Sequence, residues 1–523
     1  MPSLFLGLDS STQSISSVLI DLETGHILDE RSLNFDRDLP DYMTENGVNR
    51  QAGSKEVHSS PLMWAEGLDR LFQQMKKAKL PLGEILAISG SGQQHGSVYM
   101  TDLAGKQFSE MDLNGTLADN TARVLSRPPS PVWMDNSTSQ ECEDIRVALG
   151  GLEKTVALTG SDMIERFTGP QIRKFATEQP GAYKQTGHIA LVSSFLSSLM
   201  AGQISPIDYG DGAGMNLMDI ARFTWSPEAL NATAPHLREK LPALAPSHSV
   251  LGTINPYLSL RYGVNPSAKA VIWSGDNPCS LIGTGLVKPG HTAISLGTSD
   301  TLFGAMSKCK TDPRGEGHVF GSPAGNYMSL ICFKNGSLAR ENVKDLYNLD
   351  WTAFSHALRE SPVGNDGKMM LPWFEPEIVP RVSTSGIHRK NLDEQDVKGN
   401  CRAVVEAQMI SMRLHSEWMG DKPTRIYATG GASMNQDILQ IMADVFQAPV
   451  FRQETANGAA LGAALRAAHA WTKDTLGDAD WEHIVGPFTM PEPGFETLPN
   501  SGNTAIYDLQ LKKYAEFEAE MLS

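Results

Sequence analysis

The sequence predicts an α/β protein made of two related domains, and three observations support this. At 523 residues the chain is too long for one hydrophobic core and should divide into about two or three domains. A short apolar run, a glycine, a cluster of small polar residues and a second apolar run occur twice, at residues 4–20 and 292–303. Each copy is followed by a short strand that runs into a glycine loop, at residues 86–92 and 426–432. Repetition in the same order indicates two copies of one α/β unit.

The composition is that of an ordinary globular protein and argues against several classes. Hydrophobic residues make up 41% of the chain and charged residues 20%. A net charge of −16, with no compensating basic run, argues against a nucleic-acid partner. The five scattered cysteines form no Cys-x-x-Cys pair, which indicates reduced thiols rather than disulfides or a zinc site. No signal peptide precedes Leu4 and no apolar run reaches membrane-spanning length, so we expect a cytoplasmic protein without a membrane partner.

The first polar corner has the residue types of a phosphate site. Residues 4–14 predict a strand, a polar corner and the start of a second strand. Gly7 and the small residues 10–12 would let a phosphate approach backbone N–H groups, and the hydroxyls would add donors. Asp9 suits a hydrated Mg²⁺ held against those phosphates. The alternative is a hairpin whose corner merely favours small polar residues, and the second copy is what favours the phosphate interpretation.

The next strand points to a ligand site. Pro61 opens an amphipathic helix, and a strand at residues 86–88 then runs into Gly-Ser-Gly-Gln-Gln-His-Gly at residues 90–96. In open α/β sheets, ligands collect beyond the carboxyl ends of strands. Gln94 and His95 are therefore candidates for the wall of a polyhydroxy-ligand site, although a structural histidine explains His95 equally well.

Two further segments carry weaker candidates. Trp133 and Asp135 could pack against and hydrogen-bond a sugar, but Asp135 or Asn136 equally fits a helix N-cap. Arg166 precedes Phe-Thr-Gly-Pro, and an isolated arginine is usually solvated or ion-paired. Neither segment is decisive alone.

Asp276 is a candidate general base. A strand at residues 270–273 runs into Ser-Gly-Asp-Asn-Pro, where Pro278 fits the first helical position and Asn277 the N-cap. This leaves the Asp276 carboxylate at a strand end, where a general base for a hydroxyl nucleophile is needed. A turn aspartate is the equally weighted alternative.

The second half of the chain contains a pattern typical of nucleotide sites. A helix at residues 399–418, a strand at 425–428, the loop Thr-Gly-Gly-Ala-Ser and another helix follow in order. The glycines would admit a purine or ribose, and Asn435 could hydrogen-bond it. Residues 456–470 predict a helix of small residues suited to close packing. The order of the tail from Trp481 stays open.

Nine segments in the same order resemble the FGGY carbohydrate kinases, in the pattern of their eukaryotic members. They lie at residues 7–14, 91–99, 131–135, 165–169, 205–209, 275–278, 295–303, 332–338 and 428–433. The resemblance runs from about Leu4 to about His469. Nine matched segments are far more specific than one glycine loop.

The resemblance implies two actin-like (ribonuclease H-like) ATPase domains with a central cleft, over residues 1–283 and 284–523. It implies Asp276 as the catalytic base of the first domain. The implied sugar contacts are Gln94, His95, Trp133, Arg166, Asp276 and Asn277. The implied ATP and phosphate contacts are Thr12, Gln13, Thr298, Trp351, Gly431, Ala432 and Asn435, with Asp9 as the Mg²⁺ ligand.

The activity that the resemblance implies is ATP-dependent phosphorylation of D-xylulose to D-xylulose 5-phosphate. The expected partners are a small sugar and ATP, with a homodimer left open. The alternatives are another kinase of this family acting on ribulose, fuculose or glycerol, and a non-catalytic actin-like ATP-binding module. Many family members carry a Gly-Glu-Arg-x-Pro loop where this chain has residues 375–380, Glu-Pro-Glu-Ile-Val-Pro. No function is assigned to that loop.

Overall fold

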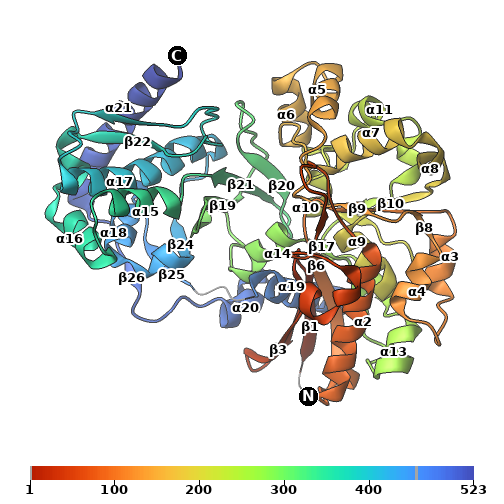
Figure 1. Ribbon diagram of the computed structural model, residues 1–523. Coiled ribbons are helices and arrows are strands. Elements are labelled where there is room, and N and C mark those ends of the chain that lie inside the picture. The colour runs from red at the N-terminus through yellow and green to blue at the C-terminus, as the bar shows by residue number, and fades with distance from the viewer. Residues whose placement is uncertain (1–2, 454–456) are drawn as a thin grey trace. The chain divides into compact units, whose positions relative to one another are not determined.

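The computed structural model describes residues 3–453 and 457–523, which form two compact units (Figure 1). The first unit comprises Met1–Val287, Val319–Tyr327 and Ala456–Thr489. The second comprises Lys288–His318, Met328–Thr455 and Met490–Ser523. Within the described residues, no helix combines the length and the apolar character needed to cross a membrane.

The first unit is organised around a mixed sheet with the strand order β15-β16-β6-β1-β2-β3. These strands are β15 (Val250–Thr253), β16 (Lys269–Val271), β6 (Ile85–Gly92), β1 (Leu4–Ser10), β2 (Ser14–Asp21) and β3 (His26–Asn34). β1, β2 and β3 are antiparallel, whereas β1, β6 and β16 run parallel, and the short β17 (Ser274–Gly275) also pairs in parallel with β6. The predicted first hairpin is therefore confirmed as β1 and β2.

Helices cover both faces of this sheet because successive side chains of a strand point to opposite faces. Leu4, Leu6 and Leu8 belong to the core shared with α2 (Pro61–Lys77) and α9 (Val192–Ala201). Phe5 belongs to the opposite core, shared with α19 (Gly458–Leu476). A Cβ on Gly7 would lie 2.0 Å from the Ala460 carbonyl oxygen. Gly7 therefore makes room for the backbone of α19. The sequence had instead predicted that Gly7 would make room for a phosphate.

The predicted helix of small residues is confirmed as α19, although Ala456 lies outside the described residues. α19, drawn in blue, packs against β1 and against α14 (Asp276–Gly283), drawn in red and green (Figure 1). A Cβ on Gly462 would lie 1.8 Å from the Cys279 carbonyl oxygen. The small side chains let α14 and α19 approach until their backbones touch.

The second unit repeats the strand order of the first. Its sheet runs β21-β19-β18-β24-β25-β26, with β18 and β19 antiparallel and β18, β24 and β25 parallel. The strands are β21 (Tyr327–Phe333), β19 (Asp300–Met306), β18 (His291–Leu296), β24 (Arg425–Thr429), β25 (Val450–Arg452) and β26 (Glu496–Thr497). The series β21-β19-β18-β24-β25 matches β3-β2-β1-β6-β16 of the first unit. The internal repeat predicted from the sequence is therefore present in the topology.

The helices of the second unit pack around α17 (Val397–Ser416). Its neighbours are α15 (Ser337–Leu346), α16 (Trp351–Glu360), α18 (Gln436–Phe446) and α21 (Thr504–Leu522). The Tyr507 hydroxyl of α21 lies 2.8 Å from both the Arg402 guanidinium and the Glu406 carboxylate of α17. The tail from Trp481, whose order the sequence left open, thus ends in a packed helix.

The remaining elements are short. The strands are β4 (Asn49–Arg50), β5 (Val57–Ser59), β7 (Ser97–Met100), β8 (Leu125–Arg127), β9 (Ser130–Pro131), β10 (His188–Leu191), β11 (Ile207–Asp208), β12 (Met218–Asp219), β13 (Thr224–Trp225), β14 (Leu244–Ala245), β20 (His318–Gly321), β22 (Met369–Trp373) and β23 (Gly386–Lys390). The helices are α1 (Phe35–Asp38), α3 (Ala104–Ser109), α4 (Leu117–Ala122), α5 (Ser139–Ala148), α6 (Leu152–Thr159), α7 (Thr168–Glu178), α8 (Pro180–Gln185), α10 (Tyr209–Ala213), α11 (Pro227–Thr233), α12 (Leu237–Lys240), α13 (Pro256–Tyr262) and α20 (Trp481–Val485).

Candidate active site

Three loops of the first unit leave the sheet at the same edge. β1 ends at Ser10, β6 at Gly92 and β17 at Gly275. Ser10 and Gly275 are both register partners of Gly92. Because parallel strands carry their carboxyl ends to one edge, the segments 11–13, 93–95 and 276–277 lie together there. The sequence candidates in these segments therefore belong to one site.

Asp276 is the first residue of α14, whose N-cap is Gly275 and not, as expected, Asn277. Its Oδ1 accepts hydrogen bonds from the backbone N–H groups of Gln94 at 3.3 Å and Asn277 at 2.9 Å, and from Asn277 Nδ2 at 3.2 Å. Burial, together with the charge of Asp9, raises the pKa of Asp276 to about 7. A carboxylate with a pKa near neutrality is well suited to general-base chemistry.

Asp9 lies buried at the end of β1. The Ser11 and Ser91 hydroxyls each donate to one of its two carboxylate oxygens. Burial raises the pKa of Asp9, and these two hydrogen bonds oppose the rise. No group of three or more acidic, histidine or cysteine side chains within the described ranges forms a metal cage. One or two carboxylates completed by substrate phosphates is the usual Mg²⁺ arrangement, and Asp9 with its neighbouring hydroxyls fits it.

The polar corner between β1 and β2 is tied to the segment around Trp133. Thr12 Oγ1 accepts a hydrogen bond from the Trp133 indole N–H at 2.8 Å and lies 3.4 Å from Gln93 Oε1. The Trp133 side chain is 41% exposed, so its ring can still face a ligand while its N–H holds the corner. Gln13 lies on the wall of an adjoining cavity of about 850 Å³, together with Arg50.

His95 and Arg166 come together through Phe167. The His95 and Phe167 ring centroids are 4.1 Å apart, and the Arg166 guanidinium carbon lies 5.8 Å from the Phe167 ring. The Thr168 hydroxyl donates to the His95 carbonyl oxygen at 3.0 Å. On the other side, a Cβ on Gly214 would lie 2.5 Å from His95 Nδ1. These contacts place both sugar-site candidates against Phe167.

The second unit holds a separate cavity of about 800 Å³ beside its own hairpin. The predicted residues on its wall are Thr298, Trp351, Gly431, Ala432 and Asn435. Trp351 is 45% exposed, and a Cβ on Gly431 would meet no atom within 4 Å. An open glycine surface and an exposed indole suit a flat nucleobase.

Asn435 also caps a helix, which the sequence did not reveal. Its Oδ1 caps α18 by accepting from the N–H groups of Asp437 at 3.0 Å and Ile438 at 3.2 Å, and its Nδ2 donates to Ser355 at 2.6 Å. One amide hydrogen is left for a ligand.

A buried ion pair that the sequence analysis missed supports the second hairpin, which is formed by β18 and β19. Arg340 of α15 binds Asp300, the first residue of β19, through two hydrogen bonds of 2.7 and 3.0 Å. Arg340 Nη1 also donates to Gln408, whose amide donates to the carbonyl oxygens of Asn335 and Gly336. Despite the facing arginine, burial raises the pKa of Asp300.

The loop at residues 375–380, to which the sequence assigned no function, also contributes contacts near the second hairpin. The Glu377 carboxylate accepts from the backbone N–H groups of Lys334 at 2.6 Å and Asn335 at 3.0 Å, and from Asn335 Nδ2 at 2.7 Å. The loop at residues 375–380 therefore holds the turn that leads into α15. No signal in the sequence indicated this, because the partners lie about forty residues apart.

A duplicated sheet of this order, with a hydroxyl-rich hairpin in each copy, defines the class of actin-like α/β ATPases, which confirms the expected fold class. The N-terminal domain of the FGGY family of carbohydrate kinases matches residues 4–283, and the C-terminal domain of that family matches residues 292–471. The chain belongs to the FGGY family of carbohydrate kinases. Kinases of this family use ATP as a substrate.

Individual relatives match nearly the whole chain. It is 42% identical to a protein of Rattus norvegicus named xylulose kinase, covering 99% of this chain and 97% of that one. It is 41% identical to xylulose kinase 2 of Arabidopsis thaliana, with the same two coverages. The crystal structure of xylulose kinase from Rhodospirillum rubrum superimposes with a TM-score of 0.81 at 20% identity, covering 99% of both chains, which supports the fold.

Proposed function

We propose that the protein transfers the terminal phosphoryl group of ATP to D-xylulose, giving D-xylulose 5-phosphate and ADP. The observation that carries this proposal is the 42% identity, over nearly the full length, to a curated xylulose kinase. The proposal is supported by the positions of the candidates: the sugar-site candidates lie on loops of the first unit, and the base and ribose candidates line one cavity of the second.

In the proposed reaction, the Asp276 carboxylate accepts the proton of the terminal sugar hydroxyl. The hydroxyl oxygen forms a bond to the terminal phosphorus, and the bond from that phosphorus to the bridging oxygen breaks, releasing ADP. The pKa of about 7 means that Asp276 is ionised in a large fraction of molecules at neutral pH while remaining basic enough to take the proton. The chemistry otherwise depends on positioning and on charge stabilisation.

The geometry of the first unit supports the proposed sugar contacts. His95 and Arg166, held against Phe167, offer donors to sugar oxygens. Both Asn277 Nδ2 hydrogens bind Gln94 and Asp276, so the Asn277 amide would accept from a sugar hydroxyl through its oxygen. Gln94 orients Asn277, and the Trp133 ring offers an apolar face. Each of these roles is part of the proposal.

The proposed nucleotide contacts are divided between the hairpins and the second cavity. Trp351, Gly431, Ala432 and Asn435 would hold the base and ribose, and Thr12, Gln13 and Thr298 the phosphates. Mg²⁺ bound at Asp9 would neutralise phosphate charge. The assignment of residues 1–283 to the sugar and of 284–523 to adenosine, a cytoplasmic location and a homodimeric assembly complete the proposal.

The test is ADP release from Mg·ATP with D-xylulose, D-ribulose, L-fuculose and glycerol as acceptors. Strong stimulation by D-xylulose alone is the expected result. Stimulation by a different polyol would keep the mechanism and reject the substrate. Tight ATP binding without stimulation by any sugar would reject the kinase and favour a non-catalytic ATP-binding module.

A further inference from the structure

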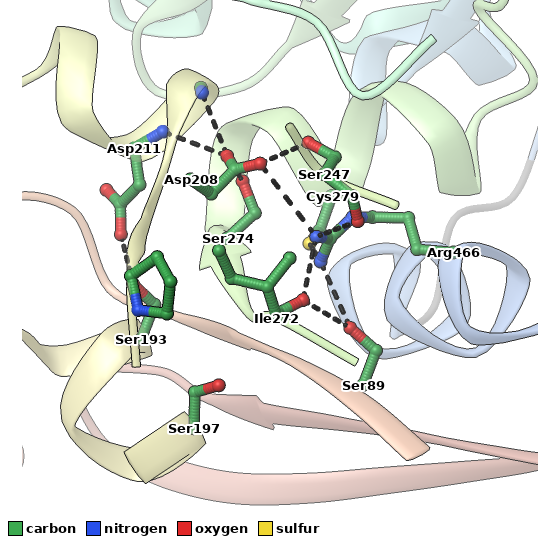
Figure 2. Close-up of polar contacts among 12 residues, drawn as sticks. Ser89, Ser193, Ser197, Asp208, Asp211, Ser247, Ile272, Ser274, Cys279 and Arg466 are labelled. Carbon is green, nitrogen blue, oxygen red and sulfur yellow. Dashed lines mark hydrogen bonds and ion pairs between the residues drawn. The ribbon is translucent and has the colours of Figure 1, made fainter. Parts of the chain in front are cut away.

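A second buried aspartate, Asp211 of α10, lies one side chain away from the proposed base. Only 2% of Asp211 is exposed. One carboxylate oxygen accepts a hydrogen bond from Gln94 Nε2 at 3.2 Å, and the other accepts from the Ser193 hydroxyl. Figure 2 shows the side chain of Asp211, in α10, pointing toward Ser193, in α9. Burial raises the pKa of Asp211 to about 7, so at pH 8 Asp211 accepts from these two donors as a carboxylate.

The position of Asp211 is fixed by Asp208, the N-cap of α10 (Figure 2). Asp208 Oδ1 accepts from the backbone N–H groups of Gly210 at 2.8 Å and Asp211 at 3.2 Å. The hydroxyls of Ser247 and Ser274 also donate to Asp208. Ser274 stands two residues before Asp276, so one carboxylate anchors both the helix of Asp211 and the strand that leads to the base.

A buried arginine, Arg466 of the helix α19, also lies near Asp208. Arg466 is 1% exposed and lies 4.0 Å from Asp208 Oδ2. Its guanidinium donates to the carbonyl oxygens of Ile272 at 2.9 Å, Ser247 at 3.1 Å and Gly90 at 3.2 Å, as the dashed lines of Figure 2 partly show. Gly90 lies in β6, the strand that precedes Gln94, and Ile272 lies between β16 and β17, the strand that precedes Asp276.

The fixed carboxylate dictates the orientation of the Gln94 side chain. A carboxylate only accepts hydrogen bonds, so Gln94 must turn its NH₂ group to Asp211. Its Oε1 is then left to accept from Asn277 Nδ2, at 2.9 Å. The same Asn277 amide donates to Asp276 Oδ1 at 3.2 Å. Asp211, Gln94, Asn277 and Asp276 therefore form a continuous chain of hydrogen bonds. In this chain Gln94 donates to Asp211, and the Asn277 amide donates both to Gln94 and to Asp276.

We propose that Asp211 is a positioning residue for phosphoryl transfer, which fixes the amide orientation of Gln94 and thereby holds Asn277 and Asp276 in place. This role rests on the proposed function of Asp276 as the base. Asp211 acts through Gln94, so its effect falls on the rate of transfer. A purely structural Asp211 would instead affect stability and leave the rate of the folded protein unchanged.

The first test compares two substitutions of Asp211, assayed at pH 8. D211A removes the acceptor that orients Gln94 and should lower kcat about tenfold or more, because small displacements of reacting groups have large kinetic effects. D211N keeps an oxygen that can accept from Gln94 and should stay within about threefold of wild type. The KM for ATP should change less than about twofold in both, since the nucleotide cavity lies in the second unit.

D69A is the matched control for loss of a buried carboxylate. Asp69 is 6% exposed and accepts from the Tyr262 hydroxyl and the Leu117 N–H, both at 2.7 Å, away from the site. It should lower the thermal midpoint without changing kcat. If D211A behaves like D69A, with a lowered midpoint and the wild-type kcat, the positioning role is wrong.

The second test reverses the polarity of the pair and does not depend on whether D211A folds. Q94E places a carboxylate against Asp211 and should lower kcat about tenfold or more. Adding D211N supplies an NH₂ group that can donate to the new carboxylate at position 94. The double variant should therefore have a kcat about tenfold higher than Q94E, although D211N alone hardly changes the kcat of wild type. A double variant no more active than Q94E contradicts the proposal.

The outcomes separate this proposal from the proposed function. All variants are compared on whichever sugar wild type phosphorylates best, so a wrong substrate assignment does not affect the pattern. An active wild type in which D211N fails to restore Q94E rejects the role of Asp211 alone. A wild type that phosphorylates no sugar rejects the proposed function and the role of Asp211 with it.

Discussion

Replacing Asp276 with asparagine should stabilise the protein and strongly slow phosphoryl transfer. The pKa of Asp276 rises from 3.8 to about 7 on folding, because of burial and the nearby charge of Asp9. One pKa unit corresponds to about 1.4 kcal/mol. Ionising Asp276 in the folded protein at pH 8 is therefore unfavourable by up to about 4 kcal/mol relative to the unfolded chain. Because the residue is partly accessible to solvent, we expect about 2–4 kcal/mol.

Asparagine should keep the hydrogen bonds that Asp276 makes. All three of its recorded partners donate to the same oxygen, Oδ1, which an amide carbonyl oxygen can replace. A carboxyl with a raised pKa binds more protons in the folded state, so stability falls as the pH rises from about 4 to about 7. The D276N variant lacks this fall. Its advantage should be complete above pH 7 and absent below about pH 4.

The assay is thermal unfolding of both proteins without ligands, at pH 4 and pH 8, together with ADP release. D276N should unfold several degrees higher at pH 8 and equally at pH 4, and should lose about 10²- to 10⁴-fold in kcat. Asp135 is the control of opposite sign, since hydrogen bonds from Ser137, Gln171 and Val57 outweigh burial and lower its pKa. D135N should lower the midpoint at pH 8. A D276N midpoint at or below wild type at pH 8 would refute the argument, because Asp276 would then ionise at little energetic expense.

Three further substitutions test other parts of the structure. Trp351→Ala should raise the KM for ATP about five- to tenfold by removing a stacking surface, with the sugar KM unchanged in steady-state kinetics. Gly7→Ala should lower the thermal midpoint sharply because the new Cβ meets a carbonyl oxygen at 2.0 Å, whereas Gly431→Ala, with no atom within 4 Å, should keep the midpoint. Arg340→Met should lower the unfolding free energy in urea by about 3–5 kcal/mol, since Asp300 is left buried and unpaired, and a second change of Asp300→Leu should recover part of this loss.

Elements defined by local patterns were predicted well. The two hairpins follow from apolar runs that flank small polar residues, and α2 and α18 follow from apolar residues at helical spacing. Boundaries were less certain. The apolar run at residues 189–200 is divided between two elements, because residues 188–191 pair with β7 as strand β10 and helix α9 begins at Val192. An apolar run of this kind suits either element until its partner is known.

Residues that act through distant partners were not found from the sequence. Asp211 stands in a glycine-rich stretch with Asp208, and two aspartates spaced three apart were the available signal. What each carboxylate does depends on Gln94 in one case and Arg466 in the other, both from other parts of the chain. Glu377 likewise gains its role only from the turn at residues 334–335.

Local spacing and short motifs in a constant order were enough to predict the duplicated α/β organisation, the two polar corners and the family. The packing of α19, from the C-terminal part of the chain, against β1 of the first unit became evident only in the folded structure. The physical reason is that helix formation depends on neighbouring residues, whereas the place of a helix depends on which surfaces fit it. Gly7 leaves the gap that α19 fills, and Arg466 finds its carbonyl partners only once α19 lies there.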